Sequence, residues 1–360
     1  MTDSPGNIPA GTPVLVTGAT GFTGAFVTRQ LVEAGLCVHA IARPSSCIAA
    51  LQDLDIRWFR GDVFDPETVA RAADGVAYVF HLAAAYREAK TSATTYTKVH
   101  VTSTQLLARA VAGRNGFQRF VHVSTVGVHG HIAHPPADEA SPFHPGDDYQ
   151  RTKAEAELWL RDFAAANRLP CTVVRPCGIY GPGDRRLLKV FRMAARGWLL
   201  VLGGGKCLYH LIHVEDLARI LPLAAAHPAV LNDVIIAGNA EPISLMRMAE
   251  IVAVHLGRAR LRVIRLPAWP FFVAGALCEA VCRPLGIEPP LYRRRVAFYT
   301  KDRAFDTSKL RAKLGYECAY TNETGLRQTA QWYAEQGWFR GRRGGKRGCD
   351  PRDSAGGQQT

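Results

Sequence analysis

The sequence predicts an α/β protein built on a doubly wound parallel sheet, and the alternation of strand-type and helix-type segments carries this prediction. Short apolar runs of β type alternate with longer stretches whose apolar residues recur at helical spacing, first in residues 14–17, 26–34 and 37–42. The alternation continues through "IRWFRGD", "VAYVFHLAA", "RFVHVST" and "CTVVRP" in the first half of the chain. Six strands joined by helical crossovers are typical of a parallel sheet with helices on both faces.

The second half of the chain is expected to form a smaller, mostly helical domain. Beyond Tyr180 the alternation gives way to loops and proline-rich joins, with one further strand candidate near residues 232–237 that is expected to return to the sheet. The chain therefore divides into four predicted parts: a flexible N-terminus (1–11), the first domain (12–180), the second domain (181–338) and a basic tail (339–360).

Composition indicates a folded protein, because 360 residues with 48% hydrophobic content suffice for an ordinary buried core. The N-terminus lacks a basic region followed by an apolar run, and no stretch reaches the about eighteen apolar residues of a spanning helix. Nine cysteines without paired spacing fit reduced thiols rather than disulfides or zinc. We therefore expect a cytoplasmic location, with association to a membrane left open.

The net charge of +13 could indicate a nucleic-acid partner, but its placement argues against one. Residues 339–360 carry six Arg or Lys and two Asp in a Gly-rich segment without periodicity, which is typical of disorder. The remainder of the chain lacks a basic face with interleaved aromatic residues. We expect no nucleic-acid binding.

A glycine-rich turn follows the first predicted strand. The segment "VLVTGATGFTG" (14–24) places Gly18, Gly21 and Gly24 between that strand and the next helix. In this context backbone N–H groups and the helix N-terminus can face a pyrophosphate. The turn is therefore expected to bind a dinucleotide cofactor, with Thr20 and Phe22 among the contacts.

The end of the second strand is where such folds bind the adenosine ribose of the cofactor. This sequence has Arg43 there and no carboxylate. A carboxylate would hydrogen-bond the 2′-hydroxyl of NAD, whereas an arginine attracts the 2′-phosphate of NADP. The sequence favours NADP. If Arg43 is only a solvated charge at the strand end, NAD remains the cofactor.

A tyrosine and a lysine lie four residues apart at the start of a predicted helix. In "DDYQRTKAEAE" (147–157), Tyr149 and Lys153 share one helix face, with Asp147 or Asp148 as the cap. A neighbouring ammonium stabilises a phenolate and brings the pKa of a tyrosine closer to the range useful for proton transfer. The pair is a candidate for acid–base chemistry, although the same spacing also occurs in surface pairs.

Upstream of this helix, "VHVSTVGVHG" (121–130) ends a strand with the hydroxyls of Ser124 and Thr125. A glycine turn, a strand-end hydroxyl and a Tyr/Lys helix, in this order, resemble the extended short-chain dehydrogenase/reductase superfamily over residues 12–338. The resemblance implies a Rossmann-type sheet, a C-terminal substrate domain and NAD(P)-dependent interconversion of an alcohol and a ketone.

The resemblance also implies roles for individual residues. Tyr149 becomes the acid/base, Lys153 binds the nicotinamide ribose, and Thr125 rather than Ser124 contacts the substrate oxygen, counted back from Gly130. The implied cofactor contacts are Asp62 and Val63 at the adenine, Ala83 and Ala84 beside the cofactor, and Pro176 and Ile179 near the nicotinamide.

One position departs from the superfamily pattern. The helix "YTKVHVTSTQLL" has His100 where the pattern usually has an asparagine that shapes the active-site backbone. His100 is therefore either an alternative proton relay or a packed helix residue. The histidines of "HGHIAH" (129–134) have no carboxylate or cysteine at ligand spacing, so the sequence predicts a polar loop there. Cys278 and Cys282 lie one helical turn apart without further ligands, so no metal site is expected at this pair either.

The substrate is not determined by the superfamily. Its sugar dehydratases carry an Asp-Glu pair after the catalytic threonine, whereas Thr125 is followed by Val126 and Gly127, which argues against a dehydratase. The apolar stretch 266–282, followed by "FDTSKLRAKLGY", resembles the 3β-hydroxysteroid/sterol dehydrogenase branch. We expect a hydrophobic substrate such as a 3β-hydroxysteroid or a sterol 4-carboxylate.

Two alternatives remain open. Arg293 to Arg295 could hold the diphosphate of a nucleotide sugar, as in a 4-epimerase or a reductase. A dinucleotide-binding protein without catalytic activity is the second alternative, although such members of the superfamily usually lack the Tyr or the Lys. A homodimer is a further open expectation.

The apolar stretch itself, "LPAWPFFVAGALCEAVC", carries a single charge, Glu279. Pro267 and Pro270 near its start make it unsuited to cross about 30 Å of hydrocarbon as a continuous helix. Three interpretations remain: a buried domain helix, an apolar wall of the substrate site, or a shallow membrane contact flanked by arginines.

Overall fold

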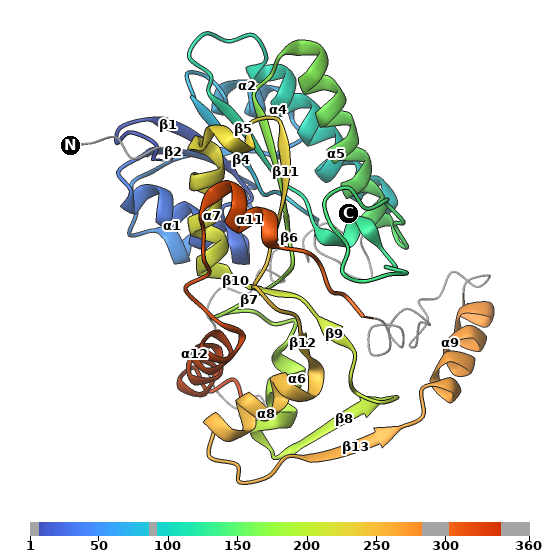
Figure 1. Ribbon diagram of the computed structural model, residues 1–360. Coiled ribbons are helices and arrows are strands. Elements are labelled where there is room, and N and C mark those ends of the chain that lie inside the picture. Colours follow the sequence, from blue (N-terminus) through green and yellow to red (C-terminus); the bar gives the residue numbers. More distant parts are fainter. Residues whose placement is uncertain (1–6, 86–91, 283–301, 340–360) are drawn as a thin grey trace, which may run out of the picture.

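The computed structural model describes residues 7–85, 92–282 and 302–339, and a seven-stranded parallel sheet forms its core (Figure 1). The strand order is β3-β2-β1-β4-β5-β6-β11, so the order reverses between β1 and β4. This is the doubly wound Rossmann-type arrangement, and the predicted fold class is confirmed. The strands are β1 (Pro13–Thr17), β2 (Cys37–Ala42), β3 (Ile56–Arg60), β4 (Tyr78–His81), β5 (Arg119–Val123), β6 (Cys171–Pro176) and β11 (Asp233–Ala237).

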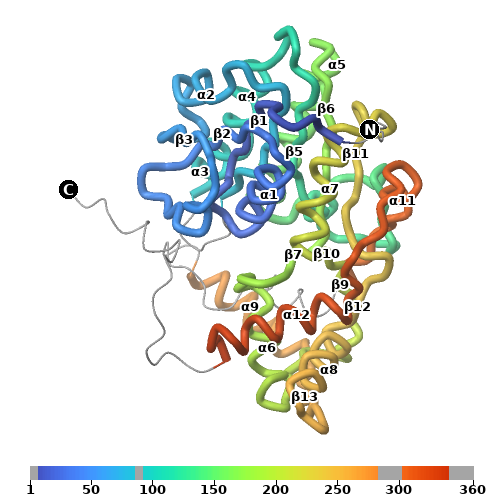
Figure 2. Tube along the Cα trace, turned by 90° about the vertical axis from the view of Figure 1, so that its left-hand side faces the viewer, coloured from blue at the N-terminus to red at the C-terminus, as the bar shows by residue number. Residues whose placement is uncertain are grey.

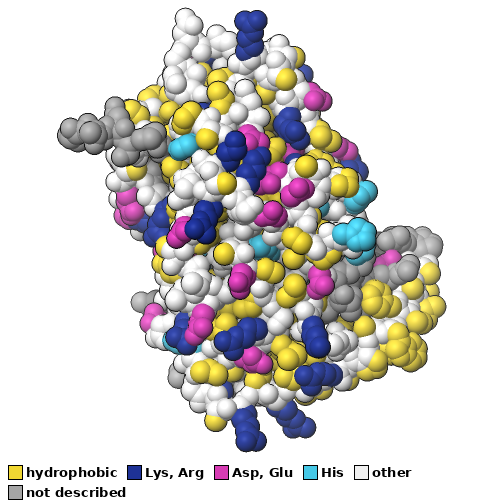
Figure 3. Space-filling model, viewed as in Figure 1, with side chains coloured by type: hydrophobic (Ala, Val, Ile, Leu, Met, Phe, Trp, Pro, Cys, Tyr) yellow, Lys and Arg dark blue, Asp and Glu magenta, His cyan; other side chains and the backbone are white. Residues whose placement is uncertain are grey.

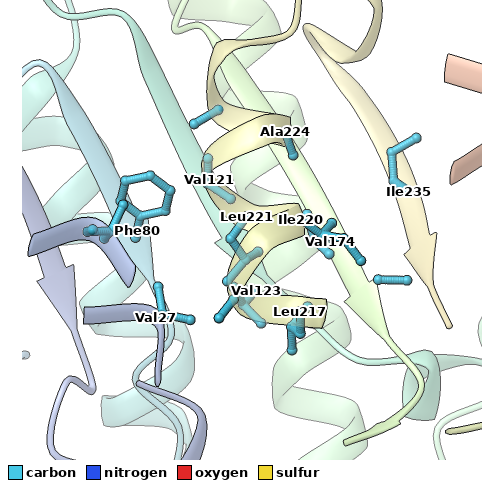
Figure 4. Packing of buried hydrophobic residues seen from close by; sticks show 14 of the residues in the cluster. Val27, Phe80, Val121, Val123, Val174, Leu217, Ile220, Leu221, Ala224 and Ile235 are labelled. Atoms are coloured by element: carbon cyan, nitrogen blue, oxygen red, sulfur yellow. The ribbon is translucent and has the colours of Figure 1, made fainter. Parts of the chain in front are cut away.

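Helices cover both faces of the sheet. On one face, Val27 of α1 and Leu217 and Leu221 of α7 pack with Val121 and Val123 of β5 (Figure 4). On the other face, a second apolar cluster joins the sheet to α2, α4 and α5. Because both faces are covered, six of the seven strands are buried along nearly their whole length, whereas β3 at the outer end of the sheet is partly exposed. The helices are α1 (Phe22–Glu33), α2 (Pro66–Ala72), α4 (Ser103–Val111), α5 (Asp148–Asn167) and α7 (Val214–Ala226).

The second half of the chain contributes to the sheet and also forms a second core. β11 pairs with β6, and α11 packs its leucines into the core of the sheet, although both lie in the range 181–338. The other core gathers around α6, α8 and α12, which lie together below the sheet in Figure 2. Short two-stranded pairs accompany these helices, and the boundaries of the second domain remain a prediction.

The elements of this half are α6 (Leu188–Ala195), α8 (Leu245–His255), α9 (Trp269–Cys282), α11 (Ser308–Leu314) and α12 (Asn322–Glu335), with the strand pairs β7 (Gly178–Tyr180) and β10 (Leu211–His213), β8 (Trp198–Leu202) and β13 (Arg262–Leu266), and β9 (Leu208–Tyr209) and β12 (Ile243–Ser244).

The apolar stretch of residues 266–282 forms the end of β13 and helix α9. In α9 only Gly275 is buried, so the interpretation as a buried domain helix is wrong. The reason is its position, because α9 stands at the outer edge of the second domain, away from the sheet (Figure 1). None of the helices in the described ranges combines the length and the hydrophobicity that a membrane span requires.

Some predictions concern the ends of the chain and its cysteines. Residues 1–6, the tail from residue 340 onward and the arginines at 293–295 lie outside the described residues. Residues 7–11, assigned to the flexible N-terminus, pack against the first domain, where Ile8 is buried and the Gly11 N–H donates to the Gly35 carbonyl at 2.8 Å. Seven cysteines in the described ranges are free thiols, and the redox state of the others stays a prediction.

A buried ion pair fixes helix α5 to the sheet. Arg175 of β6 and Glu157 of α5 are both fully buried, and the guanidinium donates to the carboxylate through Nη2 at 2.6 Å and through Nε at 3.1 Å. Arg175 Nη1 also donates to the Glu139 carbonyl at 2.9 Å and lies against the Phe143 ring. Burying two charges is costly, so the pair is stable only with such complete hydrogen bonding.

Replacing Glu157 by glutamine is expected to lower the free energy of unfolding by about 3–5 kcal/mol, because Arg175 would remain buried without its counter-charge. Urea denaturation at pH 7 measures the change. The matched control is Glu155→Gln on the same helix, whose exposed pair with Arg151 is expected to contribute only about 0–1 kcal/mol. Equal, small losses in both variants would contradict a structural role of the buried pair.

Candidate active site

The predicted site residues lie where the strands of the seven-stranded sheet end. These strands are parallel, so their carboxyl ends lie on the same side, where open α/β sheets bind ligands beside the point of strand-order reversal. The glycine turn follows β1, and its neighbour across the reversal is the segment after β4. The residues are Gly18, Thr20, Gly21, Phe22 and Gly24 after β1, Arg43 after β2, Asp62 and Val63 after β3, Ala83 and Ala84 after β4, Thr125 after β5, Pro176 at the end of β6 and Ile179 in β7.

The glycine turn has the close approaches that a phosphate cradle requires. Gly18 has φ +77°, and a Cβ atom there would lie 2.9 Å from the Ala83 nitrogen. A Cβ at Gly24 would lie 2.0 Å from the Gly18 carbonyl oxygen. Gly21 caps α1 at its N-terminus. The turn therefore fits a dinucleotide whose phosphates approach the backbone at the start of α1.

Helix α5 carries the candidate tyrosine and lysine. Asp147 caps the helix by accepting from the Gln150 N–H at 2.8 Å. Lys153 is buried, and its Nζ donates to the Val123 carbonyl at 2.7 Å, directly before Ser124 and Thr125. Burial lowers the pKa of Lys153 to about 8, while the nearby Glu157 carboxylate opposes this shift. The lysine is thus held at the end of β5.

Tyr149 is half-buried one turn before Lys153. Its ring meets the His100 ring edge to face, with centroids 5.3 Å apart, and meets the Tyr96 ring at 6.3 Å. These rings restrict the side on which a substrate can approach the phenol.

The two hydroxyls after β5 have different environments. Thr125 Oγ1 accepts from the Gly127 N–H at 3.0 Å and so caps the short helix η3 (Val126–His129). Ser124 Oγ is buried and has no hydrogen-bond partner in the part of the chain that the structure describes. Both lie beside the carbonyl that holds Lys153, and the assignment of Thr125 to the substrate oxygen remains a prediction.

The structure adds one basic residue that the sequence did not single out. Arg60 ends β3 opposite Ala42 of β2, and its Nη1 donates to the Arg43 carbonyl at 3.5 Å. Both arginine side chains are exposed. The proximity depends on the register of two strands, so no local sequence signal could have shown it.

The histidine loop has a structural role at one position. His129 is buried, its Nε2 accepts from Arg175 at 3.2 Å, and its Nδ1 donates to the Pro142 carbonyl at 3.3 Å. Burial, and after it the neighbouring Arg175 guanidinium, lowers the pKa of His129. The prediction of a polar loop is therefore wrong for His129, while His131 and His134 are exposed. No group of three metal-ligating side chains occurs within the described ranges.

Residues 14–238 match the model of the NAD dependent epimerase/dehydratase family, and the chain belongs to this family. It is an NAD(P)-dependent enzyme of the extended short-chain dehydrogenase/reductase type that acts on a small molecule. This confirms the resemblance drawn from the glycine turn, the strand-end hydroxyls and the Tyr/Lys helix.

Three known proteins show the range within this similarity. A 3 beta-hydroxysteroid dehydrogenase/Delta 5→4-isomerase of Mycobacterium tuberculosis is 30% identical over 89% of this chain and 90% of its own length. A 2-alkyl-3-oxoalkanoate reductase of Stenotrophomonas maltophilia is 31% identical over 88% and 97%. The structure of a UDP-glucose 4-epimerase from Thermotoga maritima superposes with a TM-score of 0.72 over 90% of this chain and 99% of its own, at 22% identity, which shows a shared fold.

Proposed function

We propose that this enzyme interconverts a secondary alcohol and a ketone on a hydrophobic, steroid- or sterol-like substrate. The observation that carries the chemistry is the placement of Tyr149 and Lys153 on one face of α5, with the lysine fixed at the end of β5. The apolar substrate class is supported by the two relatives above, whose names refer to a hydroxysteroid and to an alkyl-substituted oxoalkanoate.

The proposed chemistry assigns a separate task to each side chain. Bound NAD(P) supplies the hydride acceptor for oxidation or the donor for reduction. Tyr149, as phenolate, takes the proton of the substrate hydroxyl and returns it to the ketone oxygen in the reverse direction. The Lys153 ammonium stabilises that phenolate, and the Thr125 hydroxyl orients the substrate oxygen.

The substrate class is tested by reduction of NADP and NAD with a panel of 3β-hydroxysteroids, sterol 4-carboxylates, 2-alkyl-3-hydroxyalkanoates and UDP-sugars. Turnover is expected with at least one of the apolar alcohols, and kcat/KM for UDP-sugars is expected to be at least about a hundredfold lower, since unpaired polar groups discriminate strongly. Turnover of UDP-sugars alone would make the enzyme a nucleotide-sugar epimerase or reductase. Cofactor binding without turnover of any of these compounds would contradict the proposed substrate class.

We further propose NADP as the preferred cofactor, because Arg43 and Arg60 together form a basic pair at the ends of β2 and β3. Arg43→Ala is expected to raise KM for NADP about tenfold or more, the effect of losing a charge-assisted hydrogen bond, and to leave KM for NAD within about twofold. Arg57→Ala, an exposed arginine on the same strand as Arg60, is the matched control. Equal effects of Arg43→Ala on both cofactors would contradict contact with a 2′-phosphate.

Helix α9 is proposed to lie on the surface of a lipid bilayer. Trp269, Val273, Leu277 and Val281, spaced four residues apart, are 70%, 51%, 63% and 61% exposed and form one apolar stripe. An apolar patch at the corresponding corner is visible in Figure 3. With 14 residues the helix is roughly 21 Å long, too short to span a bilayer but suited to lie in its interface.

A bilayer fits this surface better than a second copy of the chain because of charge. Arg262 and Arg265 are exposed on β13, directly before α9, and the net charge of the chain is +13. Both features favour an anionic lipid surface over another molecule of the same positive charge. Such a location would bring the enzyme to an apolar substrate dissolved in lipid.

Co-sedimentation with phosphatidylcholine vesicles, with and without phosphatidylglycerol, tests this contact. Binding is expected to increase with the anionic lipid and to fall at least about tenfold in Leu277→Asp, because a carboxylate is costly in the interface. Val254→Asp, at an equally exposed apolar residue of α8, is the control and should bind as the wild type does. Failure to bind either vesicle would overturn the proposal. A homodimer in solution that Leu277→Asp dissociates would overturn it in favour of a second copy of the chain.

A further inference from the structure

His100 lies between the cofactor side of the site and the catalytic helix. Its Nε2 accepts a hydrogen bond from the Ala85 N–H at 3.0 Å, and its Nδ1 lies 2.8 Å from Thr152 Oγ1. Ala85 follows Ala83 and Ala84 after β4, and Thr152 directly precedes Lys153 on α5. The imidazole is fully enclosed, with 1% exposure, and is flanked by the rings of Tyr96 and Tyr149.

The hydrogen bonds determine the protonation state of this ring. A backbone N–H can only donate, so His100 Nε2 carries no proton and Nδ1–H donates to Thr152 Oγ1. The Thr152 hydroxyl in turn donates to the Asp148 carbonyl at 2.7 Å. These hydrogen bonds form a chain in which each donor points from Ala85 through His100 and Thr152 to the first turn of α5. In the imidazole, Nε2 is the acceptor and Nδ1 is the donor.

A local deviation of the helix backbone places His100 in this position. Residues Lys98–Thr102 form a π-helical segment, η2, between α3 (Ala93–Thr97) and α4. A π turn adds one residue to the helical repeat, and such segments are rare and frequently occur at functional sites. Here η2 packs directly against α5, so the wide turn brings the imidazole within hydrogen-bond distance of Thr152.

The segment after β4 is held from a second side as well. The Ala83 N–H donates to Thr17 Oγ1 at 3.2 Å, and Thr17 Oγ1 also lies 2.7 Å from His81 Nδ1. Residues 83–85 are therefore attached at one end to Thr17, the last residue of β1, and at the other end through His100 to α5. Loss of His100 would release the second attachment only.

We infer that His100 is a positioning residue in its neutral Nδ1–H form, which fixes the cofactor wall at Ala83 to Ala85 relative to Tyr149 and Lys153. It does not relay protons, because protonation of Nε2 would replace the acceptor of the Ala85 N–H by a second donor. The inference rests on the proposed function for its effect on turnover, but its structural consequence is independent of the substrate.

The experiment compares His100→Ala, Thr152→Val and Thr152→Ser in the full-length protein. Both His100→Ala and Thr152→Val are expected to weaken NADPH binding, followed by fluorescence, about tenfold, since each leaves a buried group without its partner. Amide hydrogen exchange of the peptide that contains Ala85 should accelerate in His100→Ala. Thr152→Ser should retain wild-type values, because it keeps the hydroxyl. Thr97→Val is the matched control, because Thr97 is a half-buried threonine of α3 whose hydroxyl donates to the Ala93 carbonyl of the same helix at 3.1 Å.

Turnover separates positioning from proton relay. With the alcohol that the panel identifies, His100→Ala should lose kcat about tenfold to a hundredfold, and added imidazole should not restore it. Rescue by imidazole would overturn the inference in favour of a relay. Wild-type NADPH affinity and wild-type exchange at Ala85 in His100→Ala would overturn it as well. NADPH binding and amide exchange require no substrate, so an error in the proposed substrate class would leave these two results intact.

Discussion

The buried pair of Glu157 and Arg175 fixes the orientation on which the proposed site depends. Tyr149, Lys153 and Glu157 follow one another at four-residue spacing and so share one face of α5. Because Glu157 is anchored to β6, this face is turned toward the sheet and Lys153 reaches the Val123 carbonyl. Arg175 extends the attachment to Glu139, whose carboxylate accepts from the Ile236 N–H of β11. One ion pair thereby connects the catalytic helix, the loop before it and the edge of the sheet.

The sequence predicted those features that depend on near neighbours along the chain. The alternation of strands and helices, the glycine turn and the Tyr149–Lys153 spacing all lie within single local segments. The pairing of Glu157 with Arg175 and of His100 with Thr152 could not be predicted, since the partners are 18 and 52 residues apart. Their contact depends on how α5 packs on the sheet and on a π turn, which composition does not reveal.

Helix α9 shows a second limit of sequence reasoning. An apolar segment has the same composition whether it packs into a core, lines a pocket or lies on a membrane. Only the surroundings distinguish these cases, and here the second domain packs around α6, α8 and α12 and leaves the α9 stripe exposed. The apolar character therefore belongs to the surface of the enzyme, which is consistent with a substrate taken from lipid.

The most direct test of the proposed mechanism is the activity of a variant that lacks the Tyr149 hydroxyl. Tyr149→Phe removes one oxygen atom and keeps the ring contacts with His100 and Tyr96. With the best alcohol as substrate, we expect kcat to fall about a hundredfold to ten-thousandfold, the usual contribution of general acid–base catalysis, while the affinity for NADPH stays unchanged. A variant that keeps wild-type kcat would contradict the assignment of Tyr149 as the acid/base.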